Sequence, residues 1–167
     1  MKKIAILYGS SLGNTKFIAE KMAKLISNSE LSSVSDITQQ DIESYDFIIL
    51  GTSTWGVGGM QDEFETFVDT LLATDLSGKI IALFGCGDQQ TYPDTYCNAV
   101  GKLFDMLQDK GCKIVGECSI EGYDFSQSLA VRDDKFVGLA IDEENQPDLT
   151  DYRIKKWLES IAKELVD

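Results

Sequence analysis

The sequence predicts a three-layer α/β protein in which helices cover both faces of a doubly wound parallel sheet. Short apolar runs recur along the 167 residues, each about as long as a buried strand. A helical pattern with one apolar face follows most of these runs, as expected of parallel β-α-β units. Several of the connecting loops are rich in glycine, serine and threonine. Together these observations predict a single domain spanning residues 1–167.

The N-terminal region predicts a strand, a helix and then a poorly patterned stretch. The apolar run Ile4–Tyr8 predicts the first strand, and residues 14–27 form a helix pattern with one apolar stripe. The following residues are mostly polar, and from them we expect a short strand at 33–36 and a helical turn at 39–44.

The middle of the chain repeats the strand-helix order twice. Residues 47–50 predict a buried strand, followed by a helix with Asp62 in its first turn, where the helix dipole favours acidic side chains. Residues 80–84 predict the next strand, and a helix over 100–107 follows it. The sheet therefore gains two more parallel strands.

The C-terminal region predicts a strand interrupted by an insertion. Residues 113–118 and 136–141 have strand character, and the polar residues 119–135 between them have no regular pattern. A helix that begins near Thr150 ends the chain.

Three loops at 9–15, 51–59 and 85–93 each follow the carboxyl end of a predicted strand. In an open parallel sheet these ends lie along one edge, and ligands bind there. We therefore expect the three loops to build one site.

The first loop has the features of a phosphate site. It leads directly into a helix, whose first backbone N–H groups lack partners within the helix. Gly9 and Gly13 allow a sharp turn, and Ser10, Ser11 and Thr15 add hydroxyl donors. The loop is neither a P-loop, because no lysine follows Gly13, nor a G-x-G-x-x-G dinucleotide fingerprint. The alternative is an ordinary strand-to-helix turn.

The other two loops each carry an aromatic residue, Trp55 and Tyr92. Two aromatic side chains beside a phosphate site indicate a planar ring held between them. The alternative is that both pack against the protein. Neighbouring small and polar residues complete the two loops, namely Thr54, Gly56, Gly87 and Asp88.

Composition narrows the chemistry. There is no histidine, which removes the commonest general base and metal ligand. The four cysteines form no C-x-x-C pair, which argues against zinc and iron–sulfur motifs, and in a cytoplasmic chain we expect them to be free thiols. The net charge is −13, and residues 25–101 contain twelve acidic residues and one basic residue, Lys79. Such a surface repels nucleic acid and anionic membranes and attracts basic proteins.

The N-terminus is basic, but the apolar run after it is too short for a signal-peptide core. No apolar run is long enough to span a membrane. We therefore expect a cytoplasmic protein.

The three loops resemble those of long-chain flavodoxins, and the similarity extends over nearly the full chain. The segments that carry it are 10–15, 54–56, 85–92, 122–125 and 135–146. The resemblance implies a sheet of five parallel strands in the order 2-1-3-4-5, with the last strand interrupted by the insertion. It also implies FMN as cofactor, with contacts at Ser10, Ser11, Leu12, Gly13, Asn14, Thr15, Thr54, Trp55, Gly56, Val57, Gly58, Cys86, Gly87, Asp88 and Tyr92.

One position departs from the family pattern. Leu12 stands where the family usually has a third hydroxyl residue, so one side-chain donor to the phosphate is missing. A hydrogen bond to a charged group contributes about 1.5–3 kcal/mol. We expect FMN to bind, with somewhat lower affinity.

The resemblance implies a low-potential one-electron carrier, not an enzyme, that cycles FMN between semiquinone and hydroquinone. Its partners would be basic-faced redox proteins, such as a flavodoxin reductase and oxidoreductase enzymes, and the carrier would be a monomer. A flavodoxin-like NAD(P)H:quinone oxidoreductase is the alternative. A receiver-type signalling domain is disfavoured, because Gly51-Thr52 and Tyr8-Gly9 stand where that class needs acidic residues.

Overall fold

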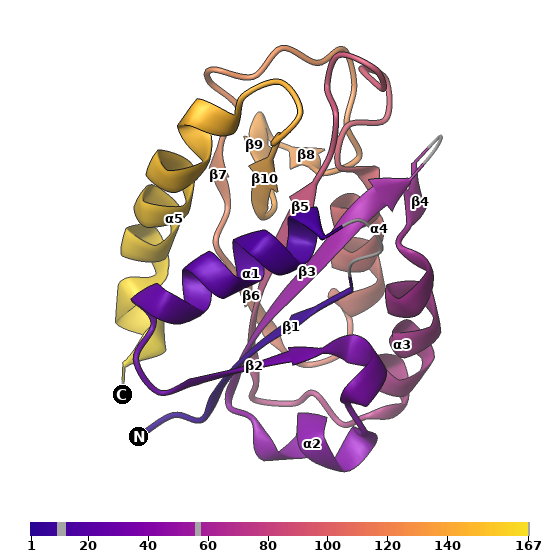
Figure 1. The fold of residues 1–167 in the computed structure, drawn as a ribbon. Helices are drawn as coiled ribbons and strands as arrows, with labels where there is room; N and C mark the ends of the chain where they lie inside the picture. The colour runs from indigo at the N-terminus through magenta and orange to yellow at the C-terminus, as the bar shows by residue number, and fades with distance from the viewer. Residues whose placement is uncertain (10–12, 56–57, 167) are drawn as a thin grey trace.

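The computed structural model describes residues 1–9, 13–55 and 58–166. It has a central sheet with helices on both faces (Figure 1). Helices α1 (Asn14–Leu25) and α5 (Thr150–Leu165) cover one face, and α3 (Asp62–Ala73) and α4 (Asn98–Leu107) cover the other. The predicted three layers are confirmed.

The main sheet has the strand order β10-β5-β3-β1-β2, and every pair of neighbours along this path is parallel. The strands are β1 (Ile4–Tyr8), β2 (Ser29–Ser33), β3 (Phe47–Trp55), β5 (Ile80–Cys86), β6 (Lys113–Val115) and β10 (Leu139–Ile141). Strand β6 pairs with the first half of β5, and β10 pairs with its second half. When β6 and β10 are taken as one interrupted strand, the predicted order 2-1-3-4-5 is confirmed.

The insertion between β6 and β10 contains a small antiparallel sheet in the order β7-β9-β8. Its strands are β7 (Cys118–Ser119), β8 (Val131–Arg132) and β9 (Lys135–Phe136). The expected strands at 113–118 and 136–141 are therefore each divided between two sheets, and 119–135 is not wholly irregular. Strands of two residues are too short to leave a pattern in the sequence.

The second strand of the sheet was placed wrongly by sequence. It spans Ser29–Ser33, and residues Val34–Asp36, expected as strand, form a 3-10 helix, η1. This edge strand is polar, and its place is determined by pairing with β1, in which Ile4 lies opposite Ser29. The expected turn at 39–44 is helix α2 (Gln39–Ser44).

Alternate residues of the central strands face the two helical layers. Ile4 and Ile6 of β1 belong to the core beneath α1 and α5, whereas Ala5 and Leu7 belong to the core beneath α3 and α4. All four side chains are buried. This double burial explains why the strands read as continuous apolar runs.

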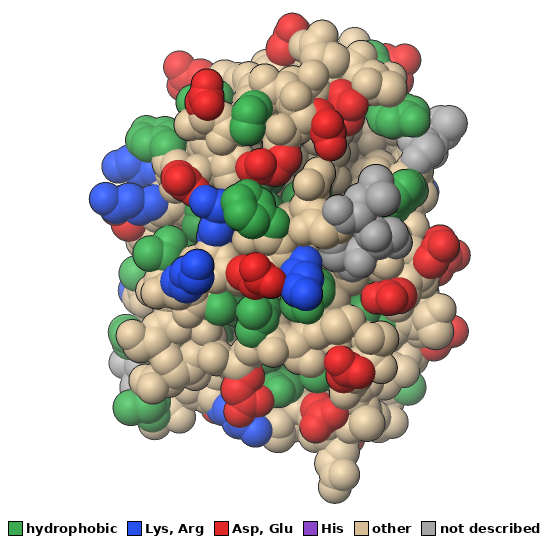
Figure 2. All heavy atoms as spheres, viewed as in Figure 1, with side chains coloured by type: hydrophobic (Ala, Val, Ile, Leu, Met, Phe, Trp, Pro, Cys, Tyr) green, Lys and Arg blue, Asp and Glu red, His purple; other side chains and the backbone are tan. Residues whose placement is uncertain are grey.

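Charge is unevenly spread over the face shown in Figure 2. Basic side chains gather over α1 and α5, and acidic ones predominate on the side of α2 and α3 and at the end of the molecule above α1.

All four cysteines are free thiols. Within the described part of the chain, no helix combines the length and apolar character needed to cross a membrane.

Candidate functional site

A pocket of about 250 Å³ lies at the carboxyl edge of the sheet, where the three predicted loops meet. Asn14 begins α1, Thr54 and Trp55 end β3, and Cys86 ends β5. The side chains and backbone that line the pocket are Asn14, Ser53, Thr54, Trp55, Cys86, Gly87, Asp88, Tyr92, Glu143 and Glu144. As expected, described residues from all three loops therefore line one pocket.

The start of α1 is capped by a glycine with a left-handed backbone conformation. Gly13 occupies the N-cap position with a φ of +93°, which a side chain would strain. Its carbonyl accepts a hydrogen bond from Phe17 N at 2.9 Å. Thr15 is buried, and its hydroxyl lies 2.5 Å from that of Ser53 on β3. The first turn of the helix is thus joined to the pocket wall.

Some of the predicted site residues do not line the pocket. Gly13, the N-cap of α1, and Thr15, in its first turn, are not among the lining residues. Gly58 is buried, and its carbonyl accepts a hydrogen bond at 2.6 Å from Nζ of Lys102, which does not line the pocket either. The remaining predicted positions, Ser10, Ser11, Leu12, Gly56 and Val57, lie outside the described residues.

Two aromatic rings stand on separate walls of the pocket. Trp55 is 38% exposed and Tyr92 is 43% exposed, so neither ring is part of a core. Trp55 ends β3 beside the short antiparallel strand β4 (Gly59–Met60), in which Gly59 lies opposite it. Tyr92 closes a turn, in which its N–H donates to the carbonyl of Asp88 at 2.9 Å. These rings are available to a planar ligand.

The pocket is lined by three carboxylates and, among the residues that the structure describes, by no lysine or arginine. Partial burial works against ionisation of Asp88. Hydrogen bonds donated by Thr91, Asn145 and Gln90 outweigh it, so the pKa of Asp88 lies below its ordinary value. The carboxylate is therefore charged at neutral pH, and the pocket is electronegative.

Sequence reasoning missed Ser53, Glu143 and Glu144. The two glutamates follow β10, so the rule that places ligands beyond the carboxyl ends of parallel strands could have found them. Asn14 Nδ2 donates to Glu144 Oε1 at 3.3 Å, and Thr150 donates to Glu143. The fifth strand thus supplies a fourth wall, next to the start of α1.

Cys86 contributes an uncharged thiol to the floor of the pocket. Burial raises its pKa to about 12, outweighing a hydrogen bond with Thr15 that works in the opposite direction. Its side chain is almost fully buried. The thiol therefore adds no negative charge at neutral pH.

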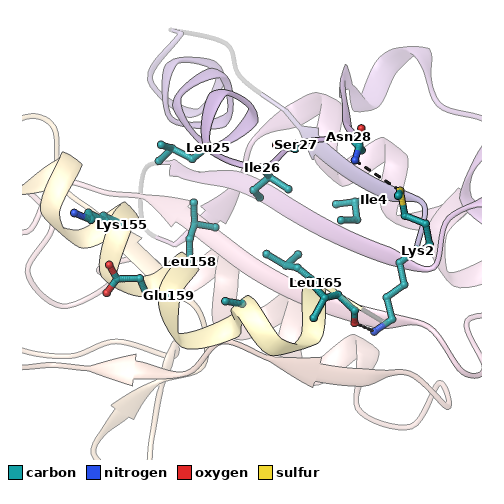
Figure 3. Close-up of a pocket in the computed structure, with 13 residues that line it drawn as sticks. Lys2, Ile4, Leu25, Ile26, Ser27, Asn28, Lys155, Leu158, Glu159 and Leu165 are labelled. Carbon is teal, nitrogen blue, oxygen red and sulfur yellow. Dashed lines mark hydrogen bonds between the residues drawn. The ribbon is translucent and has the colours of Figure 1, made fainter.

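A larger hollow of about 650 Å³ lies at the opposite end of the sheet, between the C-terminal ends of α1 and α5 (Figure 3). Apolar side chains, including Ile26, Leu158 and Leu165, line most of it. None of the predicted site residues that the structure describes is among its lining side chains. It also lacks a tryptophan or tyrosine among them, so it offers no ring for stacking.

Comparisons with known proteins point to one family. The flavodoxin family profile matches residues 6–157 of the chain. A flavodoxin of Buchnera aphidicola is 43% identical over 164 residues, covering 96% of each chain, and flavodoxin 1 of Escherichia coli K12 is 42% identical, covering 96% of this chain and 93% of its own. The crystal structure of a Fusobacterium nucleatum flavodoxin bound to flavin mononucleotide is similar, with a TM-score of 0.92, 32% identity, and coverage of 98% of this chain and 99% of that one.

Proposed function

Because the chain belongs to the flavodoxin family, we propose that its pocket binds FMN and that the protein carries single electrons between redox proteins. One observation carries the proposal: two exposed aromatic rings, Trp55 and Tyr92, flank a pocket that also reaches the first residue of α1, Asn14. The bound FMN supplies the redox chemistry, and the protein orients and tunes it.

The phosphate of FMN would be held at the start of α1. The predicted contacts there are Ser10, Ser11, Leu12, Gly13, Asn14 and Thr15. The N–H groups in the first turn of any helix lack partners within the helix, and these groups and the helix dipole favour an anion at such a position. All six residues are uncharged, so they would bind the phosphate without neutralising it.

The flavin ring would lie between Trp55 and Tyr92, with Thr54, Cys86 and Gly87 against its edges. Aromatic stacking contributes about 0.5–1.5 kcal/mol per ring beyond the burial of area. The two side chains would also keep water from the faces of the ring. The predicted contacts of Gly56, Val57 and Gly58 would complete the Trp55 loop.

Negative charge in the pocket would set the reduction potential. Asp88, Glu143 and Glu144 place carboxylates around the site, and the retained phosphate charge adds to them. A group in such a field accepts additional negative charge less readily, because like charges repel most strongly where water is excluded. We therefore propose a low-potential carrier.

The purified protein is expected to take up FMN in a 1:1 ratio. FMN fluorescence should be quenched on binding, because stacking between Trp55 and Tyr92 brings the ring into contact with both aromatic side chains. The measurement is a fluorescence titration of flavin-free protein, with riboflavin, which lacks the phosphate, as the control ligand. A colourless protein that leaves FMN fluorescence unchanged would contradict the proposal.

A flavodoxin-like quinone reductase is not favoured, because the similar proteins are named flavodoxins. Members of this family are electron carriers that interact with redox partners. We propose that the partners here present basic faces, a flavodoxin reductase among them, and that the carrier is a cytoplasmic monomer of one domain, residues 1–167. The net charge of −13 and the acidic span 25–101 support basic partners.

Electron transfer to such a partner is expected to slow as ionic strength rises from about 0.05 to 0.5 M, because salt screens attraction between acidic and basic surfaces. Stopped-flow rates with a basic flavodoxin reductase at several salt concentrations test this. Reaction with a neutral small-molecule oxidant serves as the control, and its rate should change little. If the rate of electron transfer to the reductase were also independent of salt concentration, electrostatic docking would be refuted.

A further inference from the structure

The segment that carries Tyr92 is held in place by the insertion, which lies outside the pocket. The carbonyl of Pro93, the residue after Tyr92, accepts hydrogen bonds from Ser126 N at 2.8 Å and Gln127 N at 3.0 Å. The carbonyl of Gln127 in turn accepts a hydrogen bond from Tyr96 N at 3.3 Å. Backbone groups of the insertion thus fix the chain immediately after the aromatic residue.

Gln89, a buried residue of the same loop, also connects it to the insertion. It lies between Asp88 and Tyr92, yet it is only 1% exposed. Its side-chain Oε1 accepts a hydrogen bond from Asp124 N at 2.6 Å, and its backbone N–H donates to Asp142 Oδ2 at 3.1 Å. One residue therefore links the pocket loop to both the insertion and the end of β10.

Asp142 joins this loop to the glutamates on the facing wall. It is fully buried, and its carboxylate accepts hydrogen bonds from Gln89 N, from Asn145 N at 3.0 Å and from Asn145 Nδ2 at 2.9 Å. Asn145 Nδ2 also lies 2.8 Å from Asp88 Oδ1. A buried carboxylate requires such donors, because losing water without replacement is costly. Asp142 thereby holds the turn that presents Glu143 and Glu144.

Local structure alone does not position the Tyr92 loop relative to the pocket. The side chain of Asp88 accepts hydrogen bonds from Gln90 N and Thr91 N, which shape the turn internally. Those bonds all lie within the turn and would persist if it moved as a unit. The bonds of Gln89 and Asp142 reach other elements and, together with the bonds from the insertion to the Pro93 carbonyl, they hold the turn in its place.

We infer that Gln89 and Asp142 are positioning residues for the flavin site: through them the insertion sets the place of Asp88 and Tyr92 relative to the glutamates after β10. This inference rests on the proposed binding of FMN. Neither side chain lines the pocket, so their effect on the flavin is indirect. The insertion would thus influence cofactor affinity and potential without contacting the cofactor.

The test compares Gln89→Leu with Gln90→Leu. The first change removes the acceptor of Asp124 N–H and leaves the backbone bond to Asp142 intact. The second is the same substitution one residue further along the same turn, where the side chain is exposed. We expect the dissociation constant of FMN to rise about five- to tenfold for Gln89→Leu, as for the loss of one buried hydrogen bond. Gln90→Leu should match the natural protein.

Two further readouts separate positioning from general destabilisation. The reduction potential of bound FMN should shift in Gln89→Leu and not in Gln90→Leu, because the carboxylate of Asp88 would change its distance from the ring. In flavin-free Gln89→Leu, amide hydrogen exchange should quicken at residues 89–92 and 124, while the amides of β1 and β3, which report global opening, change much less. An exchange increase of equal size in all these amides would indicate only lost stability and would overturn the inference.

The inference also fails if the two variants show the same FMN affinity, potential and exchange. Failure of the natural protein to bind FMN would instead refute the proposed function. In that case the exchange comparison on the flavin-free protein still decides whether Gln89 couples the loop to the insertion.

Discussion

Replacement of Trp55 with alanine is expected to raise the dissociation constant of FMN about 30- to 150-fold. The estimate combines about 0.5–1.5 kcal/mol of stacking with about 1.5 kcal/mol for apolar area that the flavin would no longer bury. Trp55 lines the pocket and is 38% exposed, so its removal leaves the core intact. Fluorescence titration of the flavin-free variant with FMN measures the change.

Tyr92→Ala should weaken binding in the same direction and by less, because the tyrosine ring is smaller. Tyr152→Ala is the matched control, since Tyr152 is an exposed tyrosine on α5 that does not line the flavin pocket. It should leave FMN affinity unchanged. If Trp55→Ala bound FMN as tightly as the natural protein, the ring could not lie against Trp55, and the assignment of the pocket would be wrong.

The second large effect concerns stability and the packing of the insertion against α4. Gly101 lies within this helix, and a Cβ atom there would come within 2.1 Å of the Leu129 carbonyl oxygen and 2.7 Å of Ala130 N. Both are backbone atoms, and Leu129 is held in place because its N–H donates to Asn98 Oδ1 at 2.8 Å. No side-chain rotation can relieve this overlap, so the insertion would have to move.

Gly101→Ala is therefore expected to destabilise the protein by about 2 kcal/mol. In an open helix, alanine is more stable than glycine by about 1 kcal/mol. Overpacking typically costs about 1–3 kcal/mol, and the overlap with backbone atoms places Gly101→Ala at the upper end of that range or beyond. The overpacking cost therefore exceeds the gain in helix propensity. For a chain of this size the midpoint of thermal unfolding should fall by roughly 4–8 °C. Thermal unfolding followed by circular dichroism measures it.

Gly78→Ala provides a comparison for the same substitution. Gly78 has a φ of +77°, and a Cβ atom there would meet nothing within 4 Å. Its cost would come from backbone strain alone, whereas Gly101→Ala should also quicken amide exchange at Leu129 and Ala130. A Gly101→Ala protein as stable as the natural one, or more stable, would show that the insertion yields at little cost.

The sequence by itself determined the elements with strong local patterns. Strands buried on both faces, such as Ile4–Tyr8, and helices with a complete apolar stripe, such as α5, carry their own signal. The convergence of the pocket loops also followed from sequence, because the ends of parallel strands must share an edge. Trp55, Asp88 and Tyr92, which come from two of these loops, line one pocket for this reason.

Tertiary structure decided the features that depend on distant partners. The polar edge strand Ser29–Ser33 exists because β1 offers it hydrogen bonds, and the two-residue strands of the insertion exist only as a set of three. The burial of Gln89 and Asp142 likewise depends on bonds between residues far apart in the chain, from Asp124 N to Gln89 Oε1 and from Gln89 N to Asp142 Oδ2. Local sequence records side-chain propensity, whereas these hydrogen bonds arise from contacts that form only when the chain is folded, and so only the structure could reveal them.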